Sequence, residues 1–348
     1  MPGLRVLFIG GTGVISTACA QQAVLAGFDL VMLNRGRSTT RAVPAGARVL
    51  TADVRDRAGV RQVMGDLEFD VVVNFLAYTA DQVGADVDLF GGRIGQYVFI
   101  SSASAYQTPP ARLPVLESTP LRNPYWQYSR DKIACEDLLV HAYRDSGFPA
   151  TIVRPSHTYD ATSVPLHGGW TAIDRIRRGV PVVVHGDGTS PWTLTHHVDF
   201  ARAFTGLLGE PRAVGDSFHI TSDEVLTWNQ ITVALATAAG AEPRIVHVPS
   251  DAVAALDPEW GASLLGDKAH SMIFDNSKIK NLVPGWTATV PFWRGAREIV
   301  EWHDADASRR SVDQQTEALM EQLTARWSPG SPSSAGTSPQ PSGTRQSE

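Results

Sequence analysis

A glycine-rich turn near the start of the chain constrains the fold more than any other feature of the sequence. It follows a short apolar run at 5–9 and precedes a stretch with helical periodicity at 14–26. Glycines between a buried strand and a helix allow a tight turn and let the backbone approach a pyrophosphate, which the helix N-terminus also favours. The turn therefore predicts a dinucleotide site formed by Gly10, Gly11, Thr12, Gly13, Val14 and Ile15, with Ser16 at the third small position, where glycine is usual.

The first 155 residues alternate between short apolar runs and helical stretches. The runs are rich in Val, Ile and Leu without strict alternation, which is typical of strands buried on both faces of a parallel sheet. Repeating strand–helix units predict an α/β fold with a Rossmann-like, doubly wound parallel sheet and its ligand at the carboxyl ends of the strands. The predicted strands are 5–9, 30–34, 48–51, 71–74, 97–101 and 151–154, and the predicted helices are 14–26, 57–64 and 126–146.

The regular alternation of strands and helices ends after Pro155, where longer helical stretches are separated by brief strands. This pattern predicts a smaller mixed α/β region that binds the substrate and covers the carboxyl edge of the sheet. We expect a Rossmann domain at 1–155 with late returns from the C-terminal half, a substrate-binding region at 156–327 and a disordered tail at 328–348. Helices are predicted at 169–178, 198–208, 227–239, 293–304 and 312–326, and strands at 182–185, 217–220 and 244–248.

Composition excludes several classes of protein. The chain has 348 residues, 43% of them apolar, which fits a globular protein, and its formal net charge of -6 argues against a nucleic-acid or anionic-membrane binder. No apolar stretch reaches the length of a membrane span, and the first apolar run is too short for a signal peptide. Cys19 and Cys135 form no disulfide or metal-ligand pattern. We therefore expect a cytoplasmic protein without a metal.

The end of the second predicted strand bears on the choice of cofactor. NAD sites generally place an acidic residue here to bind the ribose 2′-hydroxyl, whereas this chain has Asn34, followed by Arg35 and Arg37. Arginines in this position can pair with a 2′-phosphate, so NADP is favoured and NAD stays open. Asp53 and Val54, after the third strand, are expected to contact the adenine end.

Tyr128 and Lys132 lie four residues apart in a predicted helix. Positions i and i+4 share a helix face, so the ammonium can lower the pKa of the phenol and hold a nucleotide ribose. The phenol can then exchange a proton with an alcohol or ketone. Alone this pair is a weak signal, because amphipathic helices often carry such solvated pairs.

The glycine turn, Ser101-Ser102 at a strand end, Tyr128-x-x-x-Lys132 and Val153-Arg154-Pro155 occur in a characteristic order. In this the chain resembles an extended short-chain dehydrogenase/reductase of the NAD-dependent epimerase/dehydratase family, over roughly residues 4 to 305. The resemblance implies three catalytic residues: Ser102 polarises the substrate oxygen, Tyr128 donates or accepts the proton, and Lys132 is its electrostatic partner and a cofactor ligand. It also implies that Pro155 lines the nicotinamide pocket, that Asn74 and Ala77 lie along the diphosphate–ribose run, and that Ser104 contacts the substrate site from behind Ser102.

Two departures from the family pattern narrow the substrate. Family dehydratases carry an Asp-Glu pair where this chain has Ala103 and Ser104, so dehydration of a nucleotide hexose is disfavoured. In the segment after Gly186-Asp187-Gly188, Trp192 occupies roughly the place of an arginine that clamps a nucleotide-sugar diphosphate. Trp192 could stack on a sugar or an aromatic ring instead. Arg175, Arg177 and Arg178 are the candidates to bind a diphosphate in place of the missing arginine.

Further candidates for the substrate pocket are His157 and Tyr159, which follow Arg154-Pro155, and Trp126, which flanks the catalytic tyrosine. Each has a packing alternative in a loop or the core. His196-His197-x-Asp199 suggests metal ligation less than a structural role, because adjacent histidines point in different directions and no third ligand is evident.

The favoured function is hydride transfer at a secondary alcohol or ketone of a sugar-like small molecule, as an epimerase or as a net oxidoreductase. An NADPH-dependent reductase of a non-sugar ketone is an alternative. A different class is a silent cofactor-binding regulator or RNA-binding protein, since Asn34-Arg35-Gly36 resembles a chloroplast branch of the superfamily associated with RNA stem-loops. The superfamily also often forms homodimers, here through the Tyr128 helix and 82–95, although helices packed on their own sheet look the same.

Overall fold

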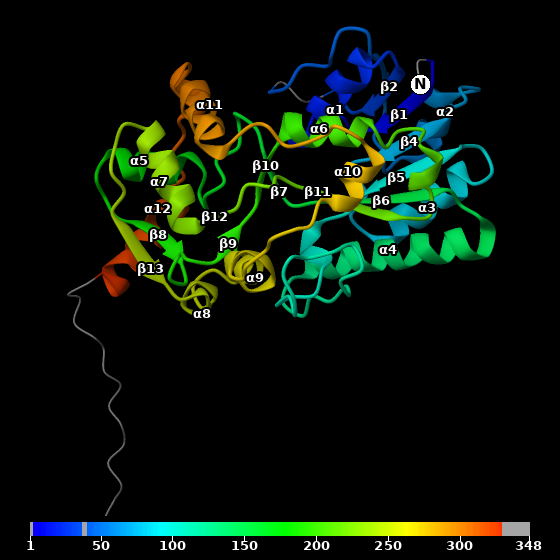
Figure 1. Cartoon of the computed structure of the whole chain (residues 1–348). Coiled ribbons are helices and arrows are strands. Elements are labelled where there is room, and N and C mark those ends of the chain that lie inside the picture. Colours follow the sequence, from blue (N-terminus) through cyan, green and yellow to red (C-terminus); the bar gives the residue numbers. More distant parts are fainter. Residues whose placement is uncertain (1–2, 37–39, 329–348) are drawn as a thin grey trace, which may run out of the picture.

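The computed structural model of the chain describes residues 3–36 and 40–328. A parallel sheet flanked by helices is joined to a second region of small sheets and helices (Figure 1). The predicted tail at 328–348 lies outside the described residues except for Ser328. Among the helices that are described, none is both long and apolar enough to cross a bilayer.

The main sheet has seven strands in the order β11-β6-β5-β4-β1-β2-β3. Every neighbouring pair is parallel, which confirms the predicted doubly wound parallel sheet. The strands are β1 Arg5–Ile9, β2 Asp29–Asn34, β3 Arg48–Thr51, β4 Val71–Asn74, β5 Gln96–Ile100, β6 Ala150–Pro155 and β11 Ser217–Ile220.

Both faces of this sheet are buried, as its continuous apolar runs require. Side chains alternate along β1, so Val6 and Phe8 pack under one layer of helices while Leu7 and Ile9 pack under the other. Helices α1 Val14–Leu25 and α6 His197–Thr205 cover the first face (Figure 1). Helices α2 Arg57–Met64, α3 Ala80–Phe90 and α4 Gln127–Ser146 cover the second.

Helix α3 was not among the helices predicted from the apolar pattern, although the dimerisation argument expected a helix around 82–95. Its start carries a capping box, in which the Gln82 side chain accepts hydrogen bonds from the backbone N–H groups of Tyr78 and Thr79 at 2.7 and 3.4 Å. Thr-x-x-Gln before a helical stretch is a recognisable start signal. Asp81, Gly84 and Asp86 interrupt the apolar pattern of this segment and obscure it.

The second region contains three two-stranded sheets: β10 with β7, β12 with β9, and β13 with β8. Two of these pairs are parallel, and β12–β9 is antiparallel. The strands are β7 His157–Tyr159, β8 Val182–His185, β9 Pro191–Trp192, β10 Leu194–His196, β12 Leu226–Thr227 and β13 Ile245–Val248. The helices are α5 Trp170–Arg177, α7 Trp228–Ala238, α8 Ser250–Ala254, α9 Pro258–Ser263, α10 Ser277–Leu282, α11 Phe292–Asp304 and α12 Gln314–Trp327, and the short turns are η1 Ala103–Ala105, η2 Pro211–Ala213, η3 Leu264–Lys268 and η4 Ala307–Arg309.

Three elements from the C-terminal half return to the main sheet. Strand β11 pairs with β6, helix α6 packs on α1, and helix α10, given above with the second region, packs on β11 with Ile279 in the core of the sheet. These are late returns of the kind that the sequence analysis allowed for. The connections before and after them place the second region beyond the carboxyl ends of the strands (Figure 1).

Candidate active site

A cleft of about 630 Å³ opens at the carboxyl ends of the parallel strands. Its floor is the glycine turn between β1 and α1, where Gly10 and Gly11 have φ angles of 99° and 125°. L-residues rarely adopt such angles. A Cβ on Gly10 would also lie 3.1 Å from Leu76 Cγ, so the turn leaves a cradle that a side chain would fill. The predicted residues Gly10, Gly11, Thr12, Gly13, Val14 and Ile15 all line this cleft.

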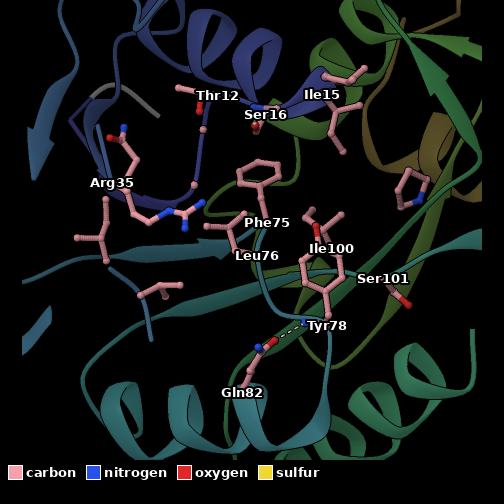
Figure 2. Close-up of a pocket in the computed structure, with 18 of the residues that line it drawn as sticks. Thr12, Ile15, Ser16, Arg35, Phe75, Leu76, Tyr78, Gln82, Ile100 and Ser101 are labelled. Atoms are coloured by element: carbon pink, nitrogen blue, oxygen red, sulfur yellow. Dashed lines mark hydrogen bonds between the residues drawn. The ribbon is translucent and has the colours of Figure 1, made fainter. Parts of the chain in front are cut away.

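Ser16 has a larger part in the turn than its small size suggested. Its Oγ accepts a hydrogen bond from the backbone N–H of Gly13 at 2.8 Å, and the residue lines the cleft at the first turn of α1 (Figure 2). A glycine here would leave that N–H to the ligand. In this chain the Gly13 N–H is bonded to the Ser16 hydroxyl instead.

The ribose and adenine end is formed by the turns after β2 and β3. Asn34 Oδ1 accepts from the Gly36 N–H at 2.8 Å, so the amide that replaces the usual acid stabilises its own turn. Arg35 is exposed, and Figure 2 shows its guanidinium pointing into the cleft toward Leu76. Arg37 lies outside the described residues. Asp53 and Val54 line the cleft as predicted, together with Arg55, which the sequence analysis missed.

Asn74 and Ala77 do not line the cleft, contrary to the expectation from the family resemblance. Asn74 is buried, and its side chain binds the Asp86 carboxylate at 2.5 Å and the Leu76 N–H at 2.7 Å. Asp86 also accepts from Tyr97 and Arg57, so Asn74 belongs to a polar network between β4 and α3. The neighbouring residues Phe75, Leu76, Tyr78 and Gln82 line the cleft in their place (Figure 2).

Lys132 is buried where α4 crosses the ends of β4 and β5. Its Nζ donates to the carbonyl oxygens of Ala77 and Ile100 at 2.7 and 2.8 Å. It also lies 5.8 Å from the centre of the Tyr128 ring. Since an ammonium has three N–H groups, one remains for a ligand in the cleft, which Lys132 lines. Ala77 thus acts on the site through its carbonyl, by holding the lysine.

Three serine hydroxyls form a chain that ends at the predicted catalytic serine. Ser129 Oγ donates to Ser104 Oγ at 2.8 Å, and Ser104 Oγ lies 2.9 Å from Ser102 Oγ. Either hydroxyl can be the donor of the bond between Ser104 and Ser102. With Ser104 as the donor, the Ser102 proton stays available for a substrate oxygen. Ser129 is fully buried on α4, and no sequence motif marked it.

The two ionisable groups of the site have shifted pKa values. Burial raises the pKa of Tyr128 to about 12, and hydrogen bonding to Ser102 opposes this rise. Burial lowers the pKa of Lys132 to about 8, with Cys135 and Glu136 opposing. The sequence analysis expected the lysine to lower the pKa of the phenol. In the protein without ligand, loss of hydration dominates instead, and the phenol keeps its proton at neutral pH.

A second pocket of about 290 Å³ adjoins the cleft. Ser102, Tyr128 and Pro155 line both spaces, so the predicted catalytic serine and tyrosine lie where the two meet. Of the predicted substrate residues, Ser104, Trp126, His157 and Trp192 line the pocket. Trp126 packs on the Tyr128 ring with centroids 4.8 Å apart.

Tyr159 is not in this pocket, and the prediction of a substrate contact there is corrected. Side chains alternate along β7, so Tyr159 is 1% exposed and its ring lies 5.3 Å from those of Phe292 and His196. It packs beneath α11, where a Cβ on Gly295 would lie 2.3 Å from its hydroxyl oxygen. Tyr159 is therefore a packing residue of the core, which was the alternative to a substrate contact.

His157 and Trp192 form one wall of the pocket. The Trp192 indole N–H donates to His157 Nδ1 at 3.2 Å, and burial lowers the pKa of His157 to about 3, so the imidazole is neutral. Two charged residues of the pocket were missed from the sequence, Asp267 and Lys268. They lie in η3 and were invisible to motif reasoning because no local pattern links them to Tyr128.

The arginines considered as substitutes for the missing diphosphate ligand are paired elsewhere. Arg175 and Arg178 bind Glu317, and Arg177 binds Asp304. His196 bonds to Glu298, and the Asp199 carboxylate accepts from the N–H groups of Thr289 and Val290. Within residues 3–36 and 40–328, no group of three or more His, Cys, Asp or Glu is arranged to hold a metal.

The cleft fits a nicotinamide dinucleotide, on the evidence of the glycine cradle, the exposed Arg35 and the free N–H of Lys132. The family model for the NAD dependent epimerase/dehydratase family matches residues 6–90 and 85–221. The chain belongs to this family. Its members are NAD(P)-dependent epimerases, dehydratases and reductases, and the NAD(P) cofactor binds at the Rossmann-type sheet.

The names of similar proteins point to different functions. The chain is 26% identical over 295 residues to a 2′-dehydrokanamycin reductase of Streptomyces kanamyceticus, covering 81% of this chain and 80% of that protein. It is 26% identical over 256 residues to a chloroplast stem-loop binding protein of 41 kDa from Arabidopsis thaliana, covering 70% and 65%. The structure of an epimerase from Methanothermobacter thermautotrophicus aligns with a TM-score of 0.72 at 15% identity, covering 88% and 94%, which supports the fold alone.

Proposed function

We propose that this protein is an NADP(H)-dependent oxidoreductase that interconverts a ketone and a secondary alcohol on a sugar-like small molecule without a nucleotide diphosphate. One observation carries the proposal: Ser102, Tyr128 and Pro155 line both the cofactor cleft and a small pocket whose lining includes Trp126 and Trp192. The reacting carbon of the substrate would lie at this junction.

In the reductive direction the chain supplies a proton and holds the substrate oxygen. The bound nicotinamide supplies the hydride. Ser102 donates a hydrogen bond to the carbonyl oxygen, and Tyr128 donates its proton to that oxygen as the alkoxide forms. The raised pKa of Tyr128 suits a donor, because the phenol is protonated at neutral pH. Lys132 holds the nucleotide ribose with its remaining N–H and stabilises the phenolate that is left.

The charge of the pocket argues against a nucleotide-sugar substrate. Trp192 stands where the family places an arginine, and Lys268 is the one Lys or Arg among the described residues that line the pocket. Lys268 is already paired with Asp267 at 3.4 Å. A diphosphate requires more positive charge than this. The relative named as a reductase supports the same type of reaction.

NADP is the proposed cofactor because the end of β2 carries Asn34 in place of the acid that usually binds the ribose 2′-hydroxyl. Asn34 is occupied by the Gly36 N–H, whereas the Arg35 guanidinium reaches the cleft, where it can pair with a 2′-phosphate. NAD is the competing cofactor.

Epimerisation is the second candidate, and the family to which the chain belongs supports it. The same residues would serve, but the hydride would return to the substrate and the cofactor would be unchanged. An RNA-binding role has the chloroplast relative in its favour. The net charge of -6 and the assembled Ser102–Tyr128–Lys132 site favour an enzyme on a small molecule instead.

The test is a screen of sugar ketones, nucleotide-sugar ketones and simple cyclic ketones with NADPH or NADH, together with the corresponding alcohols and the oxidised cofactors. Both the product and the redox state of the cofactor are measured. We expect net oxidation of NADPH with sugar-type ketones that lack a diphosphate. An isomeric product without net cofactor conversion would assign an epimerase. Turnover confined to nucleotide sugars would contradict the proposal.

A further inference from the structure

We propose that the substrate carries a cationic amino group on its ring and that Asp267 binds this group. The inference deepens the proposed function and rests on it. Asp267 lies in η3, the π-helical turn Leu264–Lys268, and lines the same pocket as Ser102 and Tyr128. Single π-helical turns are costly and occur frequently at functional sites.

The turn that carries Asp267 is held tightly against the pocket wall. The carbonyl oxygen of Gly266 accepts from the Asn123 side chain at 2.6 Å and from the Thr108 hydroxyl at 3.4 Å. A Cβ on Gly266 would lie 2.7 Å from Trp126 Cβ, so the backbone of the turn touches the aromatic residue that packs on Tyr128. Asp267 is therefore fixed relative to the reacting groups.

The Asp267 carboxylate has capacity left for a ligand. Its one side-chain partner within the described residues is Lys268 Nζ, at 3.4 Å. This is longer than the ~2.7–2.9 Å of a strong charge-assisted hydrogen bond. Burial also raises the pKa of this carboxyl, as expected for an anion that lacks donors. A ligand ammonium would supply both the donor and the compensating charge.

Lys268 is a weaker anchor for a ligand than Asp267. Its ammonium lies 5.2 Å from the centre of the Trp126 ring in addition to facing Asp267. Its charge is thus shared between a carboxylate and an aromatic face. The Asp267 carboxylate has no second partner of this kind among the described residues, so it is the stronger anchor and favours a cationic ligand.

The remaining walls suit a ring with an amino substituent. Trp126 and Trp192 offer aromatic faces to the C–H groups of a sugar-like ring. His157 is neutral because burial lowers its pKa to about 3, so it does not repel a cation. Asp267 and Tyr128 line the same pocket, so an amino group bound at Asp267 would share this pocket with the reacting carbon.

The experiment compares the binding of glucosamine, glucose and glucuronate to the full-length protein saturated with NADP⁺, by calorimetry. We expect glucosamine to bind about tenfold or more tightly than glucose, as for a hydrogen bond between charged groups, and glucuronate to bind most weakly. Asp267→Asn should bring the ratio of glucosamine to glucose affinity close to one. Asp251→Asn, an exposed carboxylate on α8, is the matched control and should leave the ratio unchanged.

Unchanged NADP⁺ binding by Asp267→Asn verifies that the variant folds. Lys268→Met should keep or increase the preference for glucosamine. Equal binding of glucose and glucosamine, preference for glucuronate, an unchanged ratio in Asp267→Asn, or no sugar binding at the highest soluble concentration would each overturn the inference. Because binding is the readout, amine preference without any reductase activity would disprove the proposed function alone, whereas ketone reduction without amine preference would disprove this inference alone.

Discussion

The cofactor cleft and the substrate pocket share Tyr128 but are built in different ways. The cleft is formed largely by backbone and short turns at consecutive strand ends, with glycines that leave room for a ligand. The pocket is formed by side chains from η1, the start of α4, β7, β9 and η3, which are far apart in the sequence. A cleft made of strand ends is common to the whole fold, whereas a pocket made of such side chains can differ in every member.

Charge also separates the two regions. All of the ten histidines except His141 lie after residue 155. In the second region burial lowers the pKa values of His157 and His185, so these side chains are neutral in the folded protein. The cofactor region instead depends on a buried lysine and an exposed arginine. The two regions should therefore respond differently to mutation and to pH.

The largest effect is expected from Tyr128→Phe, which removes the shared proton donor but keeps the ring against Trp126. Turnover should fall by about a hundredfold or more, as for the loss of a general acid, while NADPH affinity changes little. Steady-state rates and NADPH fluorescence titration measure the two quantities. Tyr125→Phe, on an exposed tyrosine three residues away, is the control. Comparable activity in the two variants would remove Tyr128 from the chemistry.

An intermediate effect is expected from Arg35→Ala, which acts on the cofactor cleft alone. NADPH affinity should fall by about tenfold to a hundredfold, because a charged hydrogen bond to the 2′-phosphate is lost, and NADH affinity should stay close to its original value. Binding titrations with both cofactors measure this. Arg61→Ala, an exposed arginine on α2, should change neither. An equal loss for the two cofactors would show that Arg35 does not read the 2′-phosphate.

The smallest effect is expected from pH, and it concerns the substrate region. Burial lowers the pKa of His185 from 6.5 to about 4. Below pH 6.5 the unfolded chain therefore binds a proton that the folded chain does not, so stability is complete above this pH and is lost as the pH falls toward 4. His185 should contribute about 1 kcal/mol of loss per pH unit in this window.

Urea unfolding at pH 7.5 and pH 5.0 measures this loss. His185→Gln retains a donor for the carbonyl oxygen of Lys268, which His185 Nε2 contacts at 2.9 Å. It should reduce the pH dependence by the share of His185, while His157, whose pKa burial also lowers, keeps its own share. The same pH dependence in the variant and the original protein would assign the acid sensitivity to other groups.

The sequence predicted the cleft more completely than the pocket. The glycine turn, Arg35, Asp53 and Lys132 were identified because each follows a strand end or lies in a local motif, and local motifs survive folding unchanged. Asn74 and Ala77 were misplaced because the resemblance named the right turn but could not say which of its side chains face inward. Tyr159 was misplaced for the same reason, since a shift of one residue along a strand changes the face.

The sequence by itself determined the parallel sheet and the family, and it brought out the residues proposed for the proton relay, because hydrophobic periodicity and short motifs encode them locally. Only the tertiary structure brought β11 and α6 back to the sheet and set Asp267 and Lys268 beside Tyr128. These contacts join segments that are far apart in the sequence, from Ile152 to Ser217 in the pairing of β6 with β11 and farther apart in the others. They depend on how the second region packs on the carboxyl edge of the sheet. The residues proposed for the chemistry thus lie in short sequence motifs, whereas the residues that line the substrate pocket come together only in the folded chain.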